Sequence, residues 1–274
     1  MTDVANLDDS VPGRFGIAAH VDAAGLHLVL RTQPEVLHHG VVRASVLAYA
    51  VDACAGIAVD EDPEVWTLTT DLSLRMRPIP APEIAEATCT IVRRGRRSTT
   101  STFEVVAHDG TAVAAGAIGF AAVPRRDGDP PKPFFPPEVA ARMFTGQSTL
   151  TEPLREAAGI QVLDAGAGVV EVDVTPELRN PAGTLQGAMV ALVAEVAAEE
   201  LAATRSDAPM VVTELDLRYL AQAPVGPVRT RTRPLGPAAD DPMQIELIDT
   251  SVDRVTTLVY ARATPVTAEP TPSG

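Results

Sequence analysis

The sequence predicts an α+β protein made of two tandem units, each with one central helix wrapped by an antiparallel sheet. Two observations support this fold class. The 274-residue sequence aligns with itself at an offset of 143 positions, without a gap over about sixty residues. Each half also contains one long apolar segment with helical periodicity and several segments with strand periodicity. Because both helices are apolar almost all round, each is expected to be buried against its own sheet.

The repeat pairs many residues that set turns or fill a core. These pairs are Gly16 with Gly159, Ile17 with Ile160, Gly25 with Gly168, Thr32 with Thr175, Gly40 with Gly183, Ala48 with Ala191, Thr70 with Thr213, Leu72 with Leu215, Leu74 with Leu217, and Arg75 with Arg218. Two such copies are expected to pack as a homodimer of single units packs. We therefore expect the two helices to lie side by side and antiparallel about an approximate two-fold axis, with one continuous sheet.

The composition of the chain suggests where the units begin and end. An N-terminal unit is expected over residues 1–123 and a C-terminal unit over residues 151–266. Residues 124–150 open with PRRDGDPPKPFFPP, which is typical of a proline-rich linker, here with a short helix. Residues 267–274 are expected to form a mobile tail.

The elements can be placed in chain order from periodicity and turn residues. In the first unit we expect a hairpin over 16–32, a helix over about 41–59, and strands near 67–76, 86–93, 99–107 and 112–122. Asp109-Gly110 is a favourable hairpin turn between the last two strands. In the second unit we expect a strand near 169–174, a helix over about 183–203, and strands near 210–219, 228–233, 243–249 and 256–263.

Charge and cysteine content exclude several classes of function. The net charge of -14 and the pI near 4.7 argue against general binding to nucleic acids or anionic membranes. The two cysteines, Cys54 and Cys89, fit small buried side chains in a reducing compartment and exclude a cysteine-rich metal site. Residues 1–12 lack the features of a signal peptide, and no apolar run reaches the roughly 18 residues that cross a bilayer. A cytoplasmic location is therefore expected.

The start of the second predicted helix carries the strongest functional signal. Residues 180–187 read NPAGTLQG, and Glu195 follows eight residues after Gly187. This stretch resembles the motif of PaaI-like hotdog-fold acyl-CoA thioesterases, in which Asn and Gly precede His-Gly-Gly and an acid follows on the same helix. Gln186 stands at the His position and Ala188 at the second Gly. The resemblance implies a double-hotdog arrangement, thioester hydrolysis, and no metal or bound cofactor.

The first unit contains a partial copy of the same motif. Gly40 aligns with the motif Gly, Arg43 with the His, Ala44 with the first Gly of the pair, and Asp52 with the acid. Leu37 stands where the motif has Asn. Because a residue eight positions along a helix lies about 12 Å away at roughly 1.5 Å per residue, one small substrate cannot contact both ends of one motif. The resemblance therefore implies sites that combine the helix start of one unit with the acid of the other.

Two composite sites follow from this pairing. The predicted catalytic site combines Asp52 as general base or nucleophile with Asn180, Gln186, the N–H of Gly187 as oxyanion donor, and Thr70 beside the acid. The predicted vestigial site joins Glu195 to Arg43 as a structural ion pair. Other interpretations stay open: Asn180 as a turn or cap, Gln186 as a polar first-turn residue, and Asp52 as a paired structural acid. Glu199 and Glu200 are expected to form a solvated patch.

Four arginines form the one basic cluster of the acidic chain. They lie at a predicted turn between two strands, where the second unit has GPAADD: Arg93, Arg94, Arg96 and Arg97. Guanidinium groups suit phosphates, so the cluster is predicted to bind coenzyme A, although a solvated turn explains it too. No metal is expected, because the adjacent His38 and His39 rarely point at one ion.

The predicted activity is hydrolysis of an acyl-CoA thioester to acid and free CoA. One alternative is a non-catalytic acyl-CoA binding or scaffold protein. A hydratase or dehydratase is a second alternative, disfavoured because no paired Asp and His are found. The expected partners are an acyl-CoA substrate and, in addition, further copies of the chain in a homo-oligomer, with no nucleic acid and no membrane.

Overall fold

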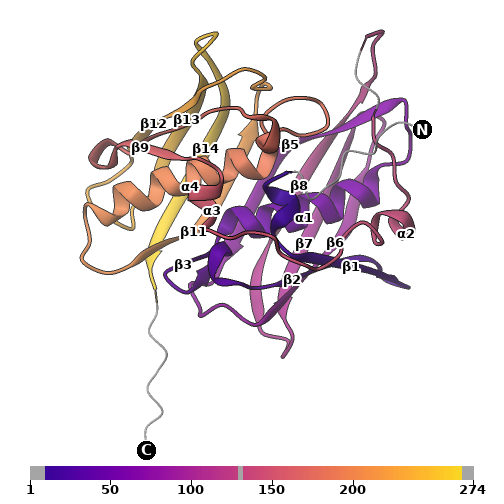
Figure 1. Cartoon of the computed structure of the whole chain (residues 1–274), viewed down its shortest axis with the longest axis horizontal. Coiled ribbons are helices and arrows are strands. Elements are labelled where there is room, and N and C mark those ends of the chain that lie inside the picture. Colours follow the sequence, from indigo (N-terminus) through magenta and orange to yellow (C-terminus); the bar gives the residue numbers. More distant parts are fainter. Residues whose placement is uncertain (1–9, 129–131, 267–274) are drawn as a thin grey trace, which may run out of the picture.

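The computed structural model describes residues 10–128 and 132–266. In these ranges, twelve strands form one sheet, and two long helices, α1 (Ala44–Val59) and α4 (Gly187–Ala203), lie on the same face of it (Figure 1). The strands of the first half are β1 (Ile17–Asp22), β2 (Gly25–Arg31), β5 (Val65–Met76), β6 (Ile84–Arg94), β7 (Ser98–Ala107) and β8 (Ala112–Pro124). Those of the second half are β9 (Gln161–Asp164), β10 (Val169–Val172), β11 (Met210–Tyr219), β12 (Val228–Pro234), β13 (Met243–Asp249) and β14 (Arg254–Pro265).

The order of the strands shows the internal duplication directly. It runs β1-β2-β6-β7-β8-β5-β11-β14-β13-β12-β10-β9, so equivalent strands appear in mirrored order from the two edges. The halves join through the antiparallel pair β5 and β11, in which Ser73 lies opposite Asp216. These two residues are also equivalent at the offset of 143 positions. An approximate two-fold axis therefore passes through this pair, and the predicted continuous sheet is confirmed.

Both central strands carry an irregularity at the same place in the repeat. The pairing of β5 with β8 shifts between Thr69 and Asp71, and the pairing of β11 with β14 shifts between Val212 and Glu214. The extra residues are the equivalent Thr70 and Thr213. A bulge of this kind interrupts the alternation of side chains between the two faces of a strand. Sequence periodicity does not reveal such a shift.

The core lies between the helices and the sheet. Leucines at alternate positions of the central strands face the helices and are fully buried, namely Leu72, Leu74, Leu215 and Leu217. Burial of one such side chain typically contributes about 1.5–3 kcal/mol. Cys54 and Cys89 are free thiols; Cys54 is buried, as predicted, whereas Cys89 is only partly buried against the core.

The helices begin three to four residues later than the sequence suggested. Val41–Val42 forms strand β4, which pairs with β3 (Leu37–His38), and Arg43 is the residue that precedes α1. Gly183 belongs to a turn before α4. Both Gly40 and Gly183 have positive φ angles, 77° and 81°, which a helix does not contain. Strand β9, of four residues, was not among the predicted strands.

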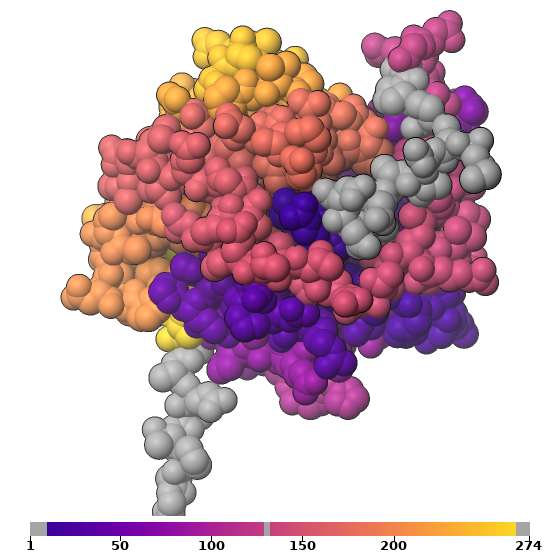
Figure 2. All heavy atoms as spheres, viewed as in Figure 1, coloured from indigo at the N-terminus to yellow at the C-terminus, as the bar shows by residue number. Residues whose placement is uncertain are grey.

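The connection between the halves packs against the first half. Short helices α2 (Pro137–Ala140) and α3 (Leu154–Ala157) flank a segment that crosses the helix-bearing face (Figure 2). Single bridges join Phe15 to Ser148 and Ala18 to Thr145, so this segment covers the edge strand β1. The predicted mobile tail, residues 267–274, lies outside the described residues. None of the described helices has the length and apolar character needed to span a bilayer.

Candidate active site

The two long helices run antiparallel, so the start of each meets the middle of the other. At one crossing, the start of α1 donates hydrogen bonds to Glu195 in the middle of α4. At the other, Gly187 at the start of α4 and Asp52 in the middle of α1 line one pocket. The predicted pairing of helix starts with acids from the other unit is therefore observed.

The pocket at the second crossing has a volume of about 600 Å³. All five predicted catalytic-site residues line it, namely Asp52, Thr70, Asn180, Gln186 and Gly187. Four aromatic residues that we did not predict line it as well: Tyr49, Trp66, Phe135 and Tyr219. Tyr49 precedes Asp52 by three positions and so shares its helix face, a spacing that could have identified it. The chain has one tryptophan and three tyrosines, so aromatic scarcity was a further signal.

Asp52 is a half-buried carboxylate with one protein partner at its Oδ1 atom. The hydroxyl of Thr69 donates a hydrogen bond to Oδ1 at 2.6 Å. Burial raises the pKa of Asp52 to about 6, and the hydrogen bond from Thr69 offsets part of this effect. An acid with this pKa is mostly ionised at neutral pH and can still accept a proton readily.

The hydroxyl beside the acid is a correction to the prediction from sequence. Thr70 lines the pocket, but its hydroxyl donates to Asp71 at 2.8 Å rather than to Asp52. The cause is the bulge between Thr69 and Asp71, which interrupts the alternation of faces. Thr69 therefore takes the position that we assigned to its neighbour.

The start of α4 combines a capped first turn with an unbonded N–H group. The side-chain oxygen of Gln186 accepts hydrogen bonds from the N–H groups of Ala188 at 2.5 Å and Met189 at 3.3 Å. Among the described residues, none accepts a hydrogen bond from the N–H of Gly187. Gln186 is thus the N-cap, and Gly187 presents a free donor at the positive end of the helix.

A tyrosine explains why glycine occupies the first position of α4. The hydroxyl of Tyr219 donates to the carbonyl of Gly187 at 3.1 Å. A Cβ atom added at Gly187 would lie 3.3 Å from that hydroxyl oxygen, closer than most Cβ contacts. Burial, and to a lesser degree the charge of Asp52, raises the pKa of Tyr219, so this hydroxyl stays protonated. Glycine therefore keeps the helix start open beneath the aromatic ring.

Asn180 supports the turn that leads into α4. Its side-chain oxygen accepts hydrogen bonds from the N–H of Thr184 at 3.2 Å and from the Thr184 hydroxyl at 3.3 Å. The backbone N–H of Asn180 donates to the carbonyl of Thr184 at 2.8 Å. The side-chain oxygen of Asn180 therefore stabilises the turn, as the alternative interpretation expected. The residue also lines the pocket.

At the other crossing, the N–H groups at the start of α1 are not free, because they donate to Glu195. Its carboxylate accepts hydrogen bonds from the N–H groups of Ala44 at 2.7 Å and Ser45 at 3.1 Å, and from the Ser45 hydroxyl at 2.5 Å. The side chain is 1% exposed. Three donors and the positive end of α1 thus stabilise the charge of Glu195.

The predicted ion pair of Arg43 with Glu195 is present at this crossing, and a second acid lies closer to Arg43. Arg43 Nη1 lies 2.8 Å from Glu199 and 4.0 Å from Glu195, so Glu199 is its direct partner. The predicted solvated patch was therefore wrong, since Glu199 is buried and Glu200 lies 2.6 Å from Arg155. Burial raises the pKa of Glu199 to about 8 although Arg43 opposes the shift. A helix turn places Glu199 four residues beyond Glu195 and on the same face.

The two crossings differ at equivalent positions of the repeat. The counterpart of Glu195 is Asp52, whose side chain is one methylene shorter and bonds Thr69 instead of a helix start. The counterpart of Thr69 is Val212, which has no hydroxyl. The shorter acid and its strand partner therefore leave the start of α4 open, and the pocket lies there.

The four arginines are exposed: Arg93 and Arg94 end β6, and Arg96 and Arg97 lie on the turn that joins it to β7. Arg94 Nη1 lies 3.0 Å from Glu61 and donates to the carbonyl of Val59 at 3.3 Å. The carbonyl of Arg97 accepts a hydrogen bond from Ala122, whose neighbours Ala121 and Val123 line the pocket. The turn is thus attached to the strand that borders the pocket.

Comparison with solved structures identifies the fold. A protein of unknown function with a hot dog fold from Alicyclobacillus acidocaldarius matches with a TM-score of 0.60 at 13% identity, over 96% of this chain and 98% of that chain. The tesB protein of Mycobacterium avium subs paratuberculosis matches with a TM-score of 0.60 at 12% identity, over 95% and 100%. An acyl-ACP thioesterase from Bacteroides thetaiotaomicron matches with a TM-score of 0.54 at 12% identity, over 91% and 98%.

These similarities extend over nearly the whole chain and assign it to the hotdog fold, which it shares with thioesterases. The hotdog fold that the helix-start motif implied is thereby confirmed. No protein-family model and no curated protein sequence matches the chain.

Proposed function

We propose that the chain is a tandem double-hotdog enzyme that hydrolyses an acyl-CoA thioester to a carboxylic acid and free CoA. The proposed units are residues 1–123 and 151–266, joined by the linker 124–150. One observation carries the proposal. A half-buried carboxylate, Asp52, and an unbonded helix N–H, that of Gly187, line the same pocket, whereas their counterparts bond each other.

The chemistry follows from these two groups. The thioester oxygen would accept a hydrogen bond from Gly187, so that charge developing on it is stabilised at the helix start. Asp52 would take a proton from water as that water attacks the carbonyl carbon. The C–S bond then breaks, and the proton held by Asp52 passes to the departing thiolate. Direct attack by the Asp52 carboxylate is an alternative first step.

The surrounding residues support this geometry. Thr69 fixes the rotamer of Asp52 through its 2.6 Å hydrogen bond, and Gln186 caps the helix that presents Gly187. Apolar and aromatic side chains, including Trp66 and Tyr49, offer a surface for the acyl chain. The arginine turn is proposed to hold the phosphates of CoA. We include no metal and no bound cofactor in the reaction.

The carrier of the acyl group is part of the proposal. We favour CoA because the arginine turn matches its three phosphates, whereas one structurally similar enzyme is an acyl-ACP thioesterase. The acidic composition and the two free cysteines fit a cytoplasmic enzyme of lipid metabolism. Further association of the chain into a homo-oligomer is compatible with the described fold.

The experiment is thiol release from a panel of acyl-CoAs and matching acyl-ACPs by the wild type, Asp52→Asn and Glu195→Gln. Loss of an acid or base catalyst typically lowers the rate about 100-fold to 10,000-fold, so Asp52→Asn is expected to lose activity to that extent. Glu195→Gln is the matched control at the equivalent position and should retain turnover. Loss of activity only in Glu195→Gln would reverse the site assignment. A wild type that binds acyl-CoA without turnover would favour the non-catalytic binding protein.

A further inference from the structure

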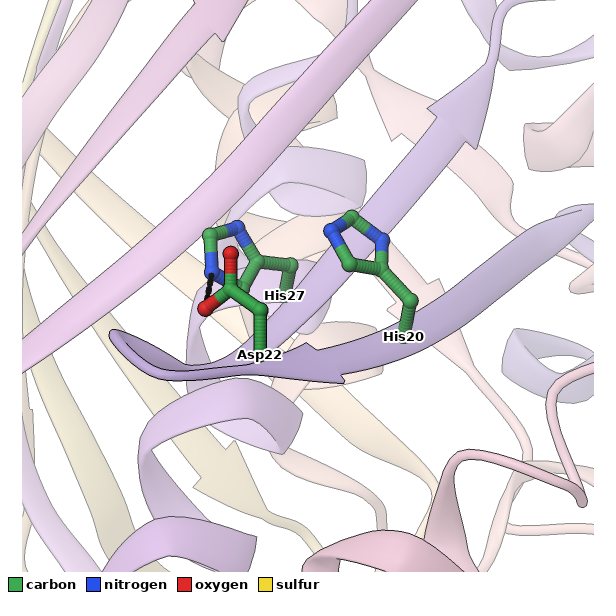
Figure 3. Close-up of side chains that lie close together, drawn as sticks. All are labelled: His20, Asp22 and His27. Carbon is green, nitrogen blue, oxygen red and sulfur yellow. Dashed lines mark hydrogen bonds and ion pairs between the residues drawn. The ribbon is translucent and has the colours of Figure 1, made fainter.

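The hairpin of β1 and β2 brings three potential metal ligands onto one outer face of the sheet. His20 lies directly opposite His27 in the antiparallel register, and Asp22 follows His20 by two residues. Side chains two residues apart on a strand share a face, so all three point the same way (Figure 3). The opposite face of β2 carries the buried Leu26 and Leu28, which pack in the core.

The ligand atoms are close enough to bind one ion. One ligand atom from each of His20, Asp22 and His27 lies within 4.8 Å of the others. Asp22 Oδ1 is 3.0 Å from His27 Nε2, and the two imidazole rings are stacked with centroids 4.6 Å apart. Metal–ligand distances of about 2.0–2.2 Å place two ligand atoms of one ion at most about 4.4 Å apart, and the 3.0 Å between Asp22 Oδ1 and His27 Nε2 lies within that limit.

A fourth residue orients the central ligand. Glu86, on the neighbouring strand β6, lies with Oε1 2.6 Å from His27 Nδ1. A carboxylate on one ring nitrogen fixes the tautomer and directs the other nitrogen toward a metal, an arrangement that recurs around bound zinc. The His27 side chain is only 11% exposed, so its ring is held by packing as well. This second-nitrogen contact distinguishes the cluster from an ordinary surface pair of histidines.

We propose that the β1–β2 hairpin binds one divalent transition-metal ion through His20, Asp22 and His27. Two imidazoles and one carboxylate suit Zn²⁺, Ni²⁺ or Cu²⁺ better than Mg²⁺ or Ca²⁺, which prefer oxygen ligands alone. The fourth coordination position would be taken by water. From the sequence we expected no metal and considered only His38 and His39, because nothing in the sequence alone showed the register of the hairpin.

The ion competes with a proton at the same nitrogen. An imidazole nitrogen binds a metal ion only when it carries no proton, so affinity should increase with pH. The charged and titratable groups around this ring are Asp22 and His20 on β1 and Glu86 on β6. None of the four residues lines the pocket, so the site is separate from the proposed active site.

Titration calorimetry of the metal-stripped full chain with ZnCl₂ tests the site. We expect one ion per chain, tighter binding at pH 7.5 than at pH 5.5, and a rise in melting temperature with zinc, since an ion that binds only the folded state stabilises it. His20→Ala should greatly weaken this binding with little effect on folding, because His20 is exposed. Glu86→Gln should weaken it about 10-fold to 100-fold, the usual effect of losing an orienting carboxylate.

The matched control is His108→Ala, which removes an exposed histidine beside Asp109 in the turn between β7 and β8. It should bind zinc like the wild type. Electron paramagnetic resonance with Cu²⁺ gives a second readout, in which nitrogen couplings from two imidazoles should fall to one in His20→Ala. Equal zinc affinity in the wild type and His20→Ala, or a wild-type Cu²⁺ spectrum with a single nitrogen, would overturn the proposal.

Discussion

Ala44 and Gly187 are equivalent first residues of the two long helices, yet the N–H of Ala44 donates to Glu195 at 2.7 Å while that of Gly187 has no acceptor among the described residues. One helix start is thus closed by an acid from the other half, and the other start lines a pocket. The duplication has therefore produced two crossings with different chemical capacity. The proposed activity is asymmetric for this reason.

The pH dependence of hydrolysis should report Asp52. Since burial raises its pKa to about 6, the base form is lost as the pH falls through that value. We expect kcat/KM to be level above about pH 7 and to fall about tenfold for each unit below pH 6. Measurement of thiol release between pH 5 and pH 8 checks this, with enzyme integrity verified at each pH. A profile that stays flat to pH 5 would exclude Asp52 as the base.

The same pKa has a consequence for stability. The folded-state pKa of Asp52 lies above its ordinary value, so the folded state binds the proton more tightly than the unfolded state does. The contribution of Asp52 to stability is therefore favourable at low pH and is lost as the pH rises through about 6. Asp52→Asn, which carries no charge, should remove this loss. Its gain in stability over the wild type should be larger at pH 8 than at pH 5.

Glu195→Gln should destabilise the fold while sparing the proposed reaction. The glutamate accepts hydrogen bonds from Ala44 and Ser45, and a glutamine amide presents only one acceptor atom to these donors. Leaving a buried donor unsatisfied typically costs about 1–3 kcal/mol, which urea unfolding can measure. Glu200→Gln is a suitable control, because Glu200 is half-buried and pairs only with Arg155. Equal unfolding midpoints for the two variants would contradict the assigned role of Glu195.

Gly187→Ala tests whether an open helix start is required. The new methyl group would meet the Tyr219 hydroxyl at 3.3 Å, so either the ring or the helix start must shift. Because small misplacements of catalytic groups are costly, we expect kcat/KM to fall about 10-fold to 100-fold. Adding Tyr219→Phe removes the crowding oxygen and should restore part of the activity, with Tyr219→Phe alone as the control. The absence of any effect from Gly187→Ala would remove this helix start from the mechanism.

The fold was predictable from the sequence because its signals are long and repeated. The offset of 143 positions joined the halves, and the Ser73–Asp216 pair shows that they pack about the axis that the repeat implied. The predicted starts of the two helices were less accurate, because a few turn residues decide where a helix begins. Gly183, with its φ of 81°, ends the turn before α4, although the apolar pattern continues smoothly across it.

The site was predictable only as far as the motif extends. Asp52, Gln186 and Gly187 were predicted from the resemblance to the thioesterase motif, and the structure places all three along one pocket. Thr69 was missed because a bulge displaces the hydroxyl by one residue, and bulges leave no periodic signal. Glu199 was misassigned because its burial depends on the antiparallel contact with α1, which brings Arg43 to within 2.8 Å of it.

The arginine turn provides the last test, which concerns the carrier of the acyl group. The turn between β6 and β7 exposes Arg93, Arg94, Arg96 and Arg97, while the net charge of the chain is -14. If these guanidinium groups bind the phosphates of CoA, replacing all four with Ala should raise KM for acyl-CoA and leave kcat nearly unchanged. The dependence of KM on salt should also flatten, because screening acts on exposed charges.

The control for net charge replaces a second group of exposed arginines. These are Arg229, Arg231 and Arg233 of β12, which pair with Glu171, Glu246 and Gln244. An equal change of KM in both variants would assign the effect to overall charge, and an unchanged KM in the first would make the turn an ordinary solvated one.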